Sequence, residues 1–353
     1  MKNYSFQGLR GLFAIGVLFS HCYFLGDYAQ SSVAFDVLFR RTANVSFFFM
    51  ISGYFLFASV AKATNFSEYI KKKIVRIYPL HIILLILLVA NSVLNGNFEF
   101  SLLNMIQIIA SALLVQTWIP KLAIATSYNT VSWFLSSLLF CYIIGYLLGK
   151  FIKRDGEKAW KATYALTAIL FTVKVVLAFI YPTEDIGYYL CYLCPLAGLS
   201  DLLIGAIISH NIEKAESGKV WLQTLALTFV ICSFFSKTLV PTNFSRAFLM
   251  VPANILLIFA FANETNFFKK IIGNKFFVFL GDISFEIYLM HAIIIGKLSR
   301  MGVFDRISNT ISPFVTLLIL IIICVVCALV YKKVVDIVFK HIKQKPQAKK
   351  QED

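Results

Sequence analysis

The sequence predicts an all-α, polytopic integral membrane protein: a bundle of about ten transmembrane helices plus one interfacial or re-entrant helix, with both termini cytoplasmic. First, 59% of the 353 residues are hydrophobic and 14% are charged, too few charged residues to cover a water-facing surface. Second, the apolar residues gather in segments near the ~20 residues that a bilayer-spanning helix needs, unlike the short alternating segments of a membrane barrel. This composition excludes a soluble enzyme, a nucleic-acid-binding domain and a secreted disulfide scaffold.

Ten apolar segments have the length of a transmembrane helix. In chain order they are residues 8–26, 43–60, 77–95, 130–149, 162–181, 190–209, 220–236, 246–262, 277–296 and 312–331. Lys2 and Arg10 precede the apolar run of the first segment, as basic residues do in a signal peptide, but no A-x-A-like cleavage site follows it, so we interpret it as a permanent helix. Residues 1–336 are therefore expected to form one transmembrane domain, and residues 337–353 a basic, disordered cytoplasmic tail.

The distribution of positive charge decides the status of an eleventh apolar stretch, residues 101–118. If this stretch does not cross the membrane, 24 Lys and Arg residues lie on the side of the N-terminus and 8 on the opposite side. This split obeys the positive-inside rule with both termini cytoplasmic. A crossing would move the basic loop 150–161 outside and the acidic loop 183–189 inside. We therefore expect an interfacial or re-entrant helix on the outer side.

Ionisable side chains inside the spans are the main candidate functional residues, because polar groups in hydrocarbon are costly unless they face a cavity or a partner. Arg10 and His21 are eleven residues apart in the first span, which places them on nearly the same helix face and about 16 Å apart along the axis. A histidine exchanges a proton near neutral pH, as a general base must. The alternatives are a snorkelling arginine and a hydrogen-bonded structural histidine.

A second histidine lies in the ninth span. Ser284, Tyr288 and His291 share one helix face at positions i, i+4 and i+7, whereas Glu286 lies off that face. Counting outward from the cytoplasmic end places His291 at about the depth of His21. Two histidines at one depth are consistent with one cavity, and Tyr288 and His291 are candidate residues for binding an acceptor there.

Two pairs of cations are candidate binding residues. Lys73 and Arg76 are i, i+3 neighbours on a cytoplasmic helix and would present two charges to a phosphate-rich ligand such as coenzyme A. The alternative is a simple topology anchor. Arg40 and Arg41, at the outer mouth, would either hold a pyrophosphate-linked acceptor or merely flank a helix.

Other polar and sulfur-containing residues of the spans carry weaker signals. Lys174 in the fifth span and Asp201 in the sixth are interior polar groups that could pair, although only their depth connects them. Cys324 and Cys327 form a C-x-x-C pair inside an apolar run, where a metal ion would lack water access and outer partners. We therefore expect no metal site.

Six motifs follow one another along the chain. They are Arg-x10-His (Arg10 and His21), FFFMISGYFLF (47–57), K-x-x-R-I-Y-P (73–79), SWFLSSLLFCY (132–142), LSDLLIGAII (199–208) and ISFEIYLMH (283–291). In this order they resemble the membrane-bound acyltransferase family 3, over about residues 5–331. Two positions depart from common family patterns: Leu138 stands where many members have Glu, and Ser46 where Asp is common.

The resemblance implies a membrane O-acyltransferase with about ten spans. Such an enzyme moves an acyl group, usually acetyl, from cytoplasmic acyl-CoA to a hydroxyl of a cell-surface or lipid-linked glycan outside. Arg10 and His21 match the family's essential arginine and histidine. Lys73 and Arg76 match its cytoplasmic R-x-x-R, with a lysine that keeps the charge but lacks the planar fork.

The partners that this resemblance implies are acyl-CoA, here acetyl-CoA, as the donor substrate, a glycan or lipid-linked saccharide acceptor, and membrane lipids, without nucleic acid or metal. The implied location is a bacterial cytoplasmic membrane. His21 would either deprotonate the acceptor hydroxyl or carry the acyl group itself. The competing classes are a secondary transporter or flippase of polysaccharide precursors, with Lys174 and Asp201 as coupling groups, and a non-catalytic assembly partner. Only the acyltransferase consumes the thioester.

Overall fold

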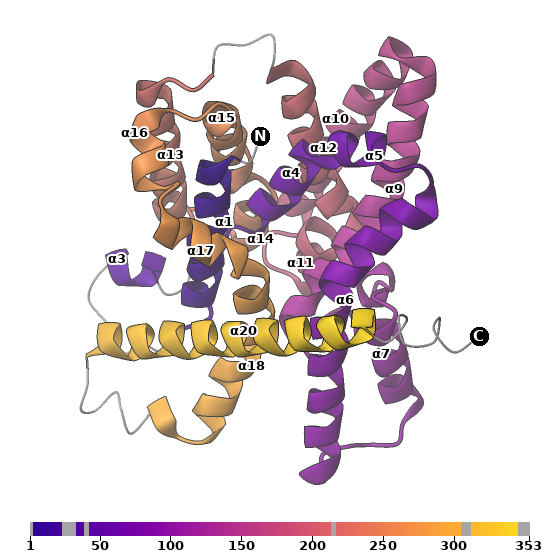
Figure 1. Ribbon diagram of the computed structural model, residues 1–353, viewed down its shortest axis with the longest axis vertical. Helices are drawn as coiled ribbons and strands as arrows, with labels where there is room; N and C mark the ends of the chain where they lie inside the picture. The colour runs from indigo at the N-terminus through magenta and orange to yellow at the C-terminus, as the bar shows by residue number, and fades with distance from the viewer. Residues whose placement is uncertain (1–2, 23–32, 39–41, 213–216, 305–311, 345–353) are drawn as a thin grey trace.

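A computed structural model of the protein describes residues 3–22, 33–38, 42–212, 217–304 and 312–344 (Figure 1). Within these ranges all regular structure is helical and no strand occurs, so the predicted all-α class is confirmed. Its α-helices are α1 (Tyr4–Ser20), α3 (Val33–Asp36), α4 (Val45–Tyr54), α5 (Leu56–Ala61), α6 (Phe66–Leu94), α7 (Leu102–Ala112), α8 (Leu122–Ala125), α9 (Trp133–Asp155), α10 (Glu157–Ile180), α11 (Asp185–Tyr188), α12 (Pro195–Asn211), α13 (Val220–Ser236), α14 (Thr242–Phe244), α15 (Met250–Phe261), α16 (Asn266–Ile271), α17 (Lys275–Asp282), α18 (Ser284–Arg300) and α20 (Pro313–Gln344). Short 3-10 or π segments are η2 (Gln116–Trp118), η3 (Thr130–Ser132), η4 (Tyr189–Leu193) and η6 (Ser245–Leu249).

Six spans among the described residues are long and apolar enough to cross a membrane, or seven if α17 and α18, bent by 65°, form one span. The protein is thus a multi-pass membrane protein, but the predicted count of ten spans is not confirmed. The predicted segment 220–236 coincides with α13, whose 17 residues are slightly short for a span. The cytoplasmic location of the termini stays a prediction.

Several helix boundaries differ from the apolar segments. The segment 43–60 breaks at Phe55 into α4 and α5, and the helix predicted from residue 77 begins at Phe66. Capping explains the earlier start, because the Asn65 side chain accepts from the Glu68 amide and Glu68 Oε2 accepts from the Thr64 amide. Hydropathy does not detect such a polar first turn. Because α6 begins at Phe66, Lys73 and Arg76 lie within this helix, as expected for i, i+3 neighbours.

The segment 101–118 forms only the 11-residue α7 followed by a turn and η2. An 11-residue helix is about 16 Å long, too short for a hydrocarbon core of about 30 Å, in agreement with the prediction that this segment does not cross. α7 lies beside α6 (Figure 1), where Tyr78 Oη and His81 Nε2 lie 2.6 and 2.7 Å from the carbonyl oxygens of Ala112 and Ser111. The Tyr78 contact satisfies a carbonyl at the end of α7, whereas the Ser111 carbonyl oxygen also accepts from the Leu114 amide at 3.0 Å.

Fusion reporters test the predicted topology. A reporter fused after Ala123 should be exported and one fused after Gly156 should be cytoplasmic, because α9 would carry the chain inward between them. Alkaline phosphatase and green fluorescent protein activities of matched fusions measure the two locations. If both fusions report the same side, the ten-span topology is wrong.

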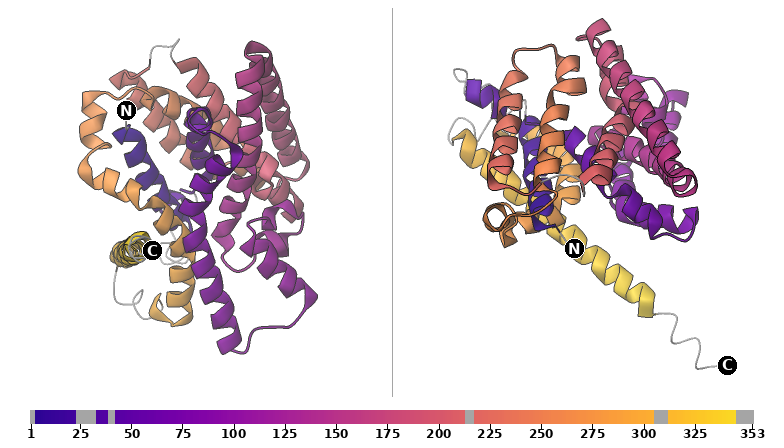
Figure 2. Two further views of the ribbon diagram at one scale, coloured as in Figure 1. Left: turned by 45° about the vertical axis from the view of Figure 1, so that its right-hand side comes forward. Right: turned by 90° about the horizontal axis from the view of Figure 1, so that it is seen from above.

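α20 crosses the direction of the other long helices, as Figures 1 and 2 show, a placement that the hydropathy of residues 312–331 does not predict. It contacts α18, and Lys332 Nζ donates to the Asp282 carbonyl at 2.5 Å. α20 continues to Gln344, beyond residue 336, where the sequence predicts the tail to begin. Residues 345–353 of that tail lie outside the described residues.

Glycines bring α1 close to the helices that carry the second histidine. A Cβ on Gly8 would lie 1.9 Å from the Ile272 carbonyl oxygen, and a Cβ on Gly281 would lie 1.9 Å from the Gln7 carbonyl oxygen. The backbone of α1 therefore touches α17 and the turn before it, as small residues allow in membrane bundles. This contact fixes α1, the helix of Arg10 and His21, against α17 and α18.

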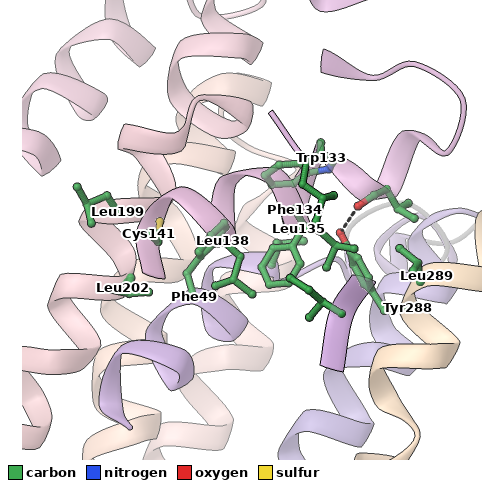
Figure 3. Packing of buried hydrophobic residues seen from close by; sticks show 14 of the residues in the cluster. Phe49, Trp133, Phe134, Leu135, Leu138, Cys141, Leu199, Leu202, Tyr288 and Leu289 are labelled. Carbon is green, nitrogen blue, oxygen red and sulfur yellow. Dashed lines mark hydrogen bonds between the residues drawn. The ribbon is translucent and has the colours of Figure 1, made fainter. Parts of the chain in front are cut away.

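The largest apolar core joins α4, α9, α12 and α18 (Figure 3). Phe49 of α4 and Leu202 of α12 pack with residues of α9, and Tyr288 and Leu289 of α18 close the cluster. The buried α9 residues in the figure are Trp133, Phe134, Leu135, Leu138 and Cys141. These helices form the walls of the candidate site.

Candidate functional site

Two cavities share the side chain of Tyr288 in their linings. We call them the cationic cavity, of about 320 Å³, which Arg10, Lys73 and Arg76 line, and the histidine cavity, of about 250 Å³, which His21 lines. The Tyr288 ring is 5% exposed, and its hydroxyl donates to the Val131 carbonyl at 3.0 Å. Tyr288 therefore stands at the boundary between the two spaces.

The cationic cavity brings together three positive charges from two helices. Arg10 comes from α1, and Lys73 and Arg76 come from one face of α6. Lys73 Nζ lies 4.7 Å from the centroid of the Tyr142 ring, and Arg10 donates to the Gln7 side chain at 3.3 Å. Among the described residues no Asp or Glu lines this cavity. Its other wall is apolar and includes Phe48, Ile51, Phe134, Leu135 and Leu138.

His21 and His291 are in direct contact, as their predicted common depth indicates. His21 is the C-terminal cap of α1, which ends at Ser20, and its Nδ1 lies 3.3 Å from Nε2 of His291. His291 is fully buried and lines neither cavity. Only His21 therefore reaches the cavity surface, which differs from the expectation that both histidines line it.

The hydrogen bonds of the two rings fix their tautomers. His21 Nδ1 lies 2.9 Å from the Val17 carbonyl oxygen, and His291 Nδ1 lies 3.2 Å from the Ile287 carbonyl oxygen. Because a carbonyl oxygen only accepts, a neutral ring must carry its single proton on Nδ1. His21 Nδ1–H is then shared between the Val17 carbonyl oxygen and the more distant Nε2 of His291, which accepts. His21 Nε2 keeps a free lone pair, since it has no hydrogen-bond partner in the described chain.

Aromatic and cationic residues form part of the remaining wall of the histidine cavity, beside neutral polar and aliphatic ones. Trp133, Tyr188 and Tyr192 line it together with Lys237 and Arg246. None of these five residues is a candidate site residue on the sequence pattern alone. The signal that could have found the two cations is their expected position on the outer side, where the positive-inside rule disfavours Lys and Arg.

Of the other residues that the sequence singles out, some lie in the described part of the chain and some do not. Lys174 and Asp201 form a buried ion pair, with 2.5 Å between Nζ and Oδ1, so the suggested pairing is confirmed. Arg40 and Arg41 lie outside the described residues. Within the described ranges no three His, Cys, Asp or Glu side chains gather closely enough to hold a metal ion.

Two comparisons with known proteins found matches to this chain. A family model described as "Acyltransferase domain" matches residues 3–332. "Acyltransferase MdmB" of Streptomyces mycarofaciens is 23% identical over 313 residues, which cover 82% of this chain and 78% of that protein. No solved structure matches the chain significantly.

Proposed function

Because this chain belongs to the acyltransferase domain family, as its six motifs predict, we propose that it is an O-acyltransferase that uses cytoplasmic acyl-CoA. The acyl group, acetyl in our proposal, would pass to a hydroxyl of a cell-surface or lipid-linked glycan at the outer side of a bacterial cytoplasmic membrane. One observation carries this proposal: a cation-lined cavity and a histidine-lined cavity meet at Tyr288.

The cationic cavity suits the donor. Coenzyme A carries several phosphate charges, and Arg10, Lys73 and Arg76 would bind them through charge-assisted hydrogen bonds. Arg76 is exposed and Lys73 is half-buried, so the cavity is accessible to a large polar ligand. The apolar wall of Phe48, Phe134 and neighbouring residues would pack against the pantetheine arm.

The thioester would reach the histidine cavity past the ring of Tyr288. The centroid of this ring lies 6.3 Å from that of Phe48 and 5.4 Å from that of Phe134. Tyr288 lines both cavities, and Phe48 and Phe134 line the cationic cavity beside it. They would exclude water from the thioester and so limit its hydrolysis.

His21 Nε2 would act as the base. Its lone pair takes the proton of the acceptor hydroxyl while the hydroxyl oxygen bonds to the thioester carbonyl carbon. The carbon–sulfur bond then breaks, and the thiolate of coenzyme A receives the proton from His21. Alternatively, Nε2 bonds to the acyl carbon first and the hydroxyl displaces it afterwards. In both routes Nε2 of His21 reacts first. The contacts of the His21 ring with Val17 and His291 fix the tautomer that leaves this nitrogen unprotonated.

His291 is in this account a positioning residue. Replacing His291 by leucine removes one of the two acceptors of His21 Nδ1–H and leaves only the Val17 carbonyl oxygen. This change should lower kcat by about 100-fold, because small misplacement of a base is costly. His291→Gln should recover part of the activity, since its amide oxygen can accept the same proton. Steady-state kinetics should show an unchanged KM for acyl-CoA. A normal kcat in folded His291→Leu would refute the positioning role.

Mass spectrometry of surface glycans tests the proposed function. Cells with the protein should carry glycans heavier by one acyl group than cells without it, and His21→Ala should behave like the deletion. A flippase predicts a different result, because its loss removes whole glycans rather than single acyl groups. Glycans of identical mass in both strains would contradict the proposal.

A further inference from the structure

We propose that the acceptor carries a negative charge near the acylated hydroxyl, as a carboxylate or a phosphate on the saccharide, and that Arg246 binds this charge. The inference rests on the proposed function, because it takes the histidine cavity as the acceptor site. It adds the chemical class of the acceptor, an anionic saccharide, because the positively charged Arg246 lines the wall of this cavity.

Two contacts hold the guanidinium of Arg246 in place. It lies over the Tyr188 ring, with 4.2 Å from Cζ to the ring centroid, and Nη1 donates to Asn243 Oδ1 at 3.2 Å. Asn243 is itself buried and fixed, because its amide donates to the carbonyl oxygens of Tyr181 and Glu184 at 2.9 and 3.0 Å. Arg246 is thus oriented before any ligand binds, which lowers the entropy cost of binding.

The remaining N–H groups of Arg246 are available to a ligand. The bond to Asn243 uses one of the five donors of the guanidinium, and the described residues offer no acceptor to the others. A planar guanidinium donates two parallel hydrogen bonds to a carboxylate or phosphate. A neutral hydroxyl would leave most of this donor capacity unused.

The charge around the cavity also favours an anion. Lys237 and Arg246 line it, whereas none of its described lining residues is Asp or Glu. Asp201, which lines a smaller adjoining cavity together with Arg246, is bonded to Lys174. The nearby carboxylate is therefore already neutralised by its own partner.

The aromatic residues of the same wall fit a sugar ring. The centroids of Trp133 and Tyr192 lie 4.7 Å apart, and Tyr188 and Tyr192 stack at 5.8 Å. These rings cover part of one another, and the surface that they present to the cavity is apolar and suits the C–H groups of a sugar beside Arg246 and His21. An anionic saccharide therefore matches the wall better than a neutral sugar or a simple anion.

Binding of three sugar probes to the full chain in lipid nanodiscs tests the proposal. The probes are glucuronate, glucose 1-phosphate and glucose, and isothermal titration measures their Kd. We expect at least one anionic probe to bind about 10-fold more tightly than glucose, which corresponds to about 1.4 kcal/mol. Arg246→Ala should abolish this preference and leave acyl-CoA binding unchanged, which shows that the variant is folded. Lys121→Ala, which removes an exposed cation outside the cavity, should leave the preference intact.

The probes also separate the two sources of charge. Tighter binding of glucuronate indicates a sugar carboxylate, and tighter binding of glucose 1-phosphate indicates the phosphate of a lipid-linked sugar. Equal affinities, no binding of any probe, or a preference that survives Arg246→Ala would overturn the proposal. If the preference is found but glycan masses do not change with the protein, the proposed function fails while the anion site stands.

Discussion

Replacing His21 by alanine should abolish acyl transfer, with kcat lowered by about 10²–10⁴-fold. The reason is the position of His21 Nε2: no described residue bonds to its lone pair, and the His21 ring lines the histidine cavity next to Tyr288. Loss of a covalent carrier would reduce the rate at least as strongly. The variant should still bind acyl-CoA, because Arg10, Lys73 and Arg76 line the other cavity.

Turnover per folded molecule is the measurement for this variant. Purified protein in nanodiscs should be assayed for release of free coenzyme A in the presence of acceptor, with acyl-CoA affinity as the test of folding. His210→Ala is a suitable control, because His210 stacks on Trp160 and lines neither cavity. Near-normal turnover in folded His21→Ala would contradict the assigned mechanism.

The double replacement of Lys73 and Arg76 by alanine should weaken acyl-CoA binding by about 100-fold or more at low salt. Hydrogen bonds to charged groups contribute about 1.5–3 kcal/mol each. Because Arg76 is exposed, we expect the loss of both side chains to cost an amount near the lower end of the sum of two such contributions. Screening should reduce the effect at high salt. kcat at saturating donor should change little, because neither side chain lines the histidine cavity.

A matched control comes from the same helix. Lys71 and Lys72 are exposed, line neither cavity and remove the same charge when both become alanine. Isothermal titration with acyl-CoA should show the loss for Lys73→Ala/Arg76→Ala and near-normal affinity for Lys71→Ala/Lys72→Ala. Equal loss in both pairs would mean that net charge, rather than the cavity, accounts for donor binding.

The helices were predictable where hydropathy alone determines them. α13 coincides with its apolar segment because both of its ends meet polar residues. Hydropathy does not reveal the break at Phe55, the bend between α17 and α18 or the placement of α20, because these depend on packing between helices. It also misses the start of α6, which side-chain capping determines.

The candidate site was predictable in its residues more than in their arrangement. Helical depth indicated that His21 and His291 are neighbours, and their rings do meet. Depth cannot show which ring faces a cavity, because that depends on the end of α1 at Ser20. Arg246 was missed because it lies in η6 before α15, where no helical periodicity relates it to His21.

Labelling of glycans in sealed membrane vesicles tests the central claim most directly. One assay tests the membrane side from which the donor binds, the transfer to a glycan acceptor and the requirement for His21. Inside-out vesicles given radiolabelled acetyl-CoA in the medium should transfer label to glycan. Right-side-out vesicles and inside-out vesicles with His21→Ala should not, although the variant still binds acetyl-CoA. Label in glycan that is independent of His21, or equal in both vesicle orientations, would contradict acyl transfer between the two cavities.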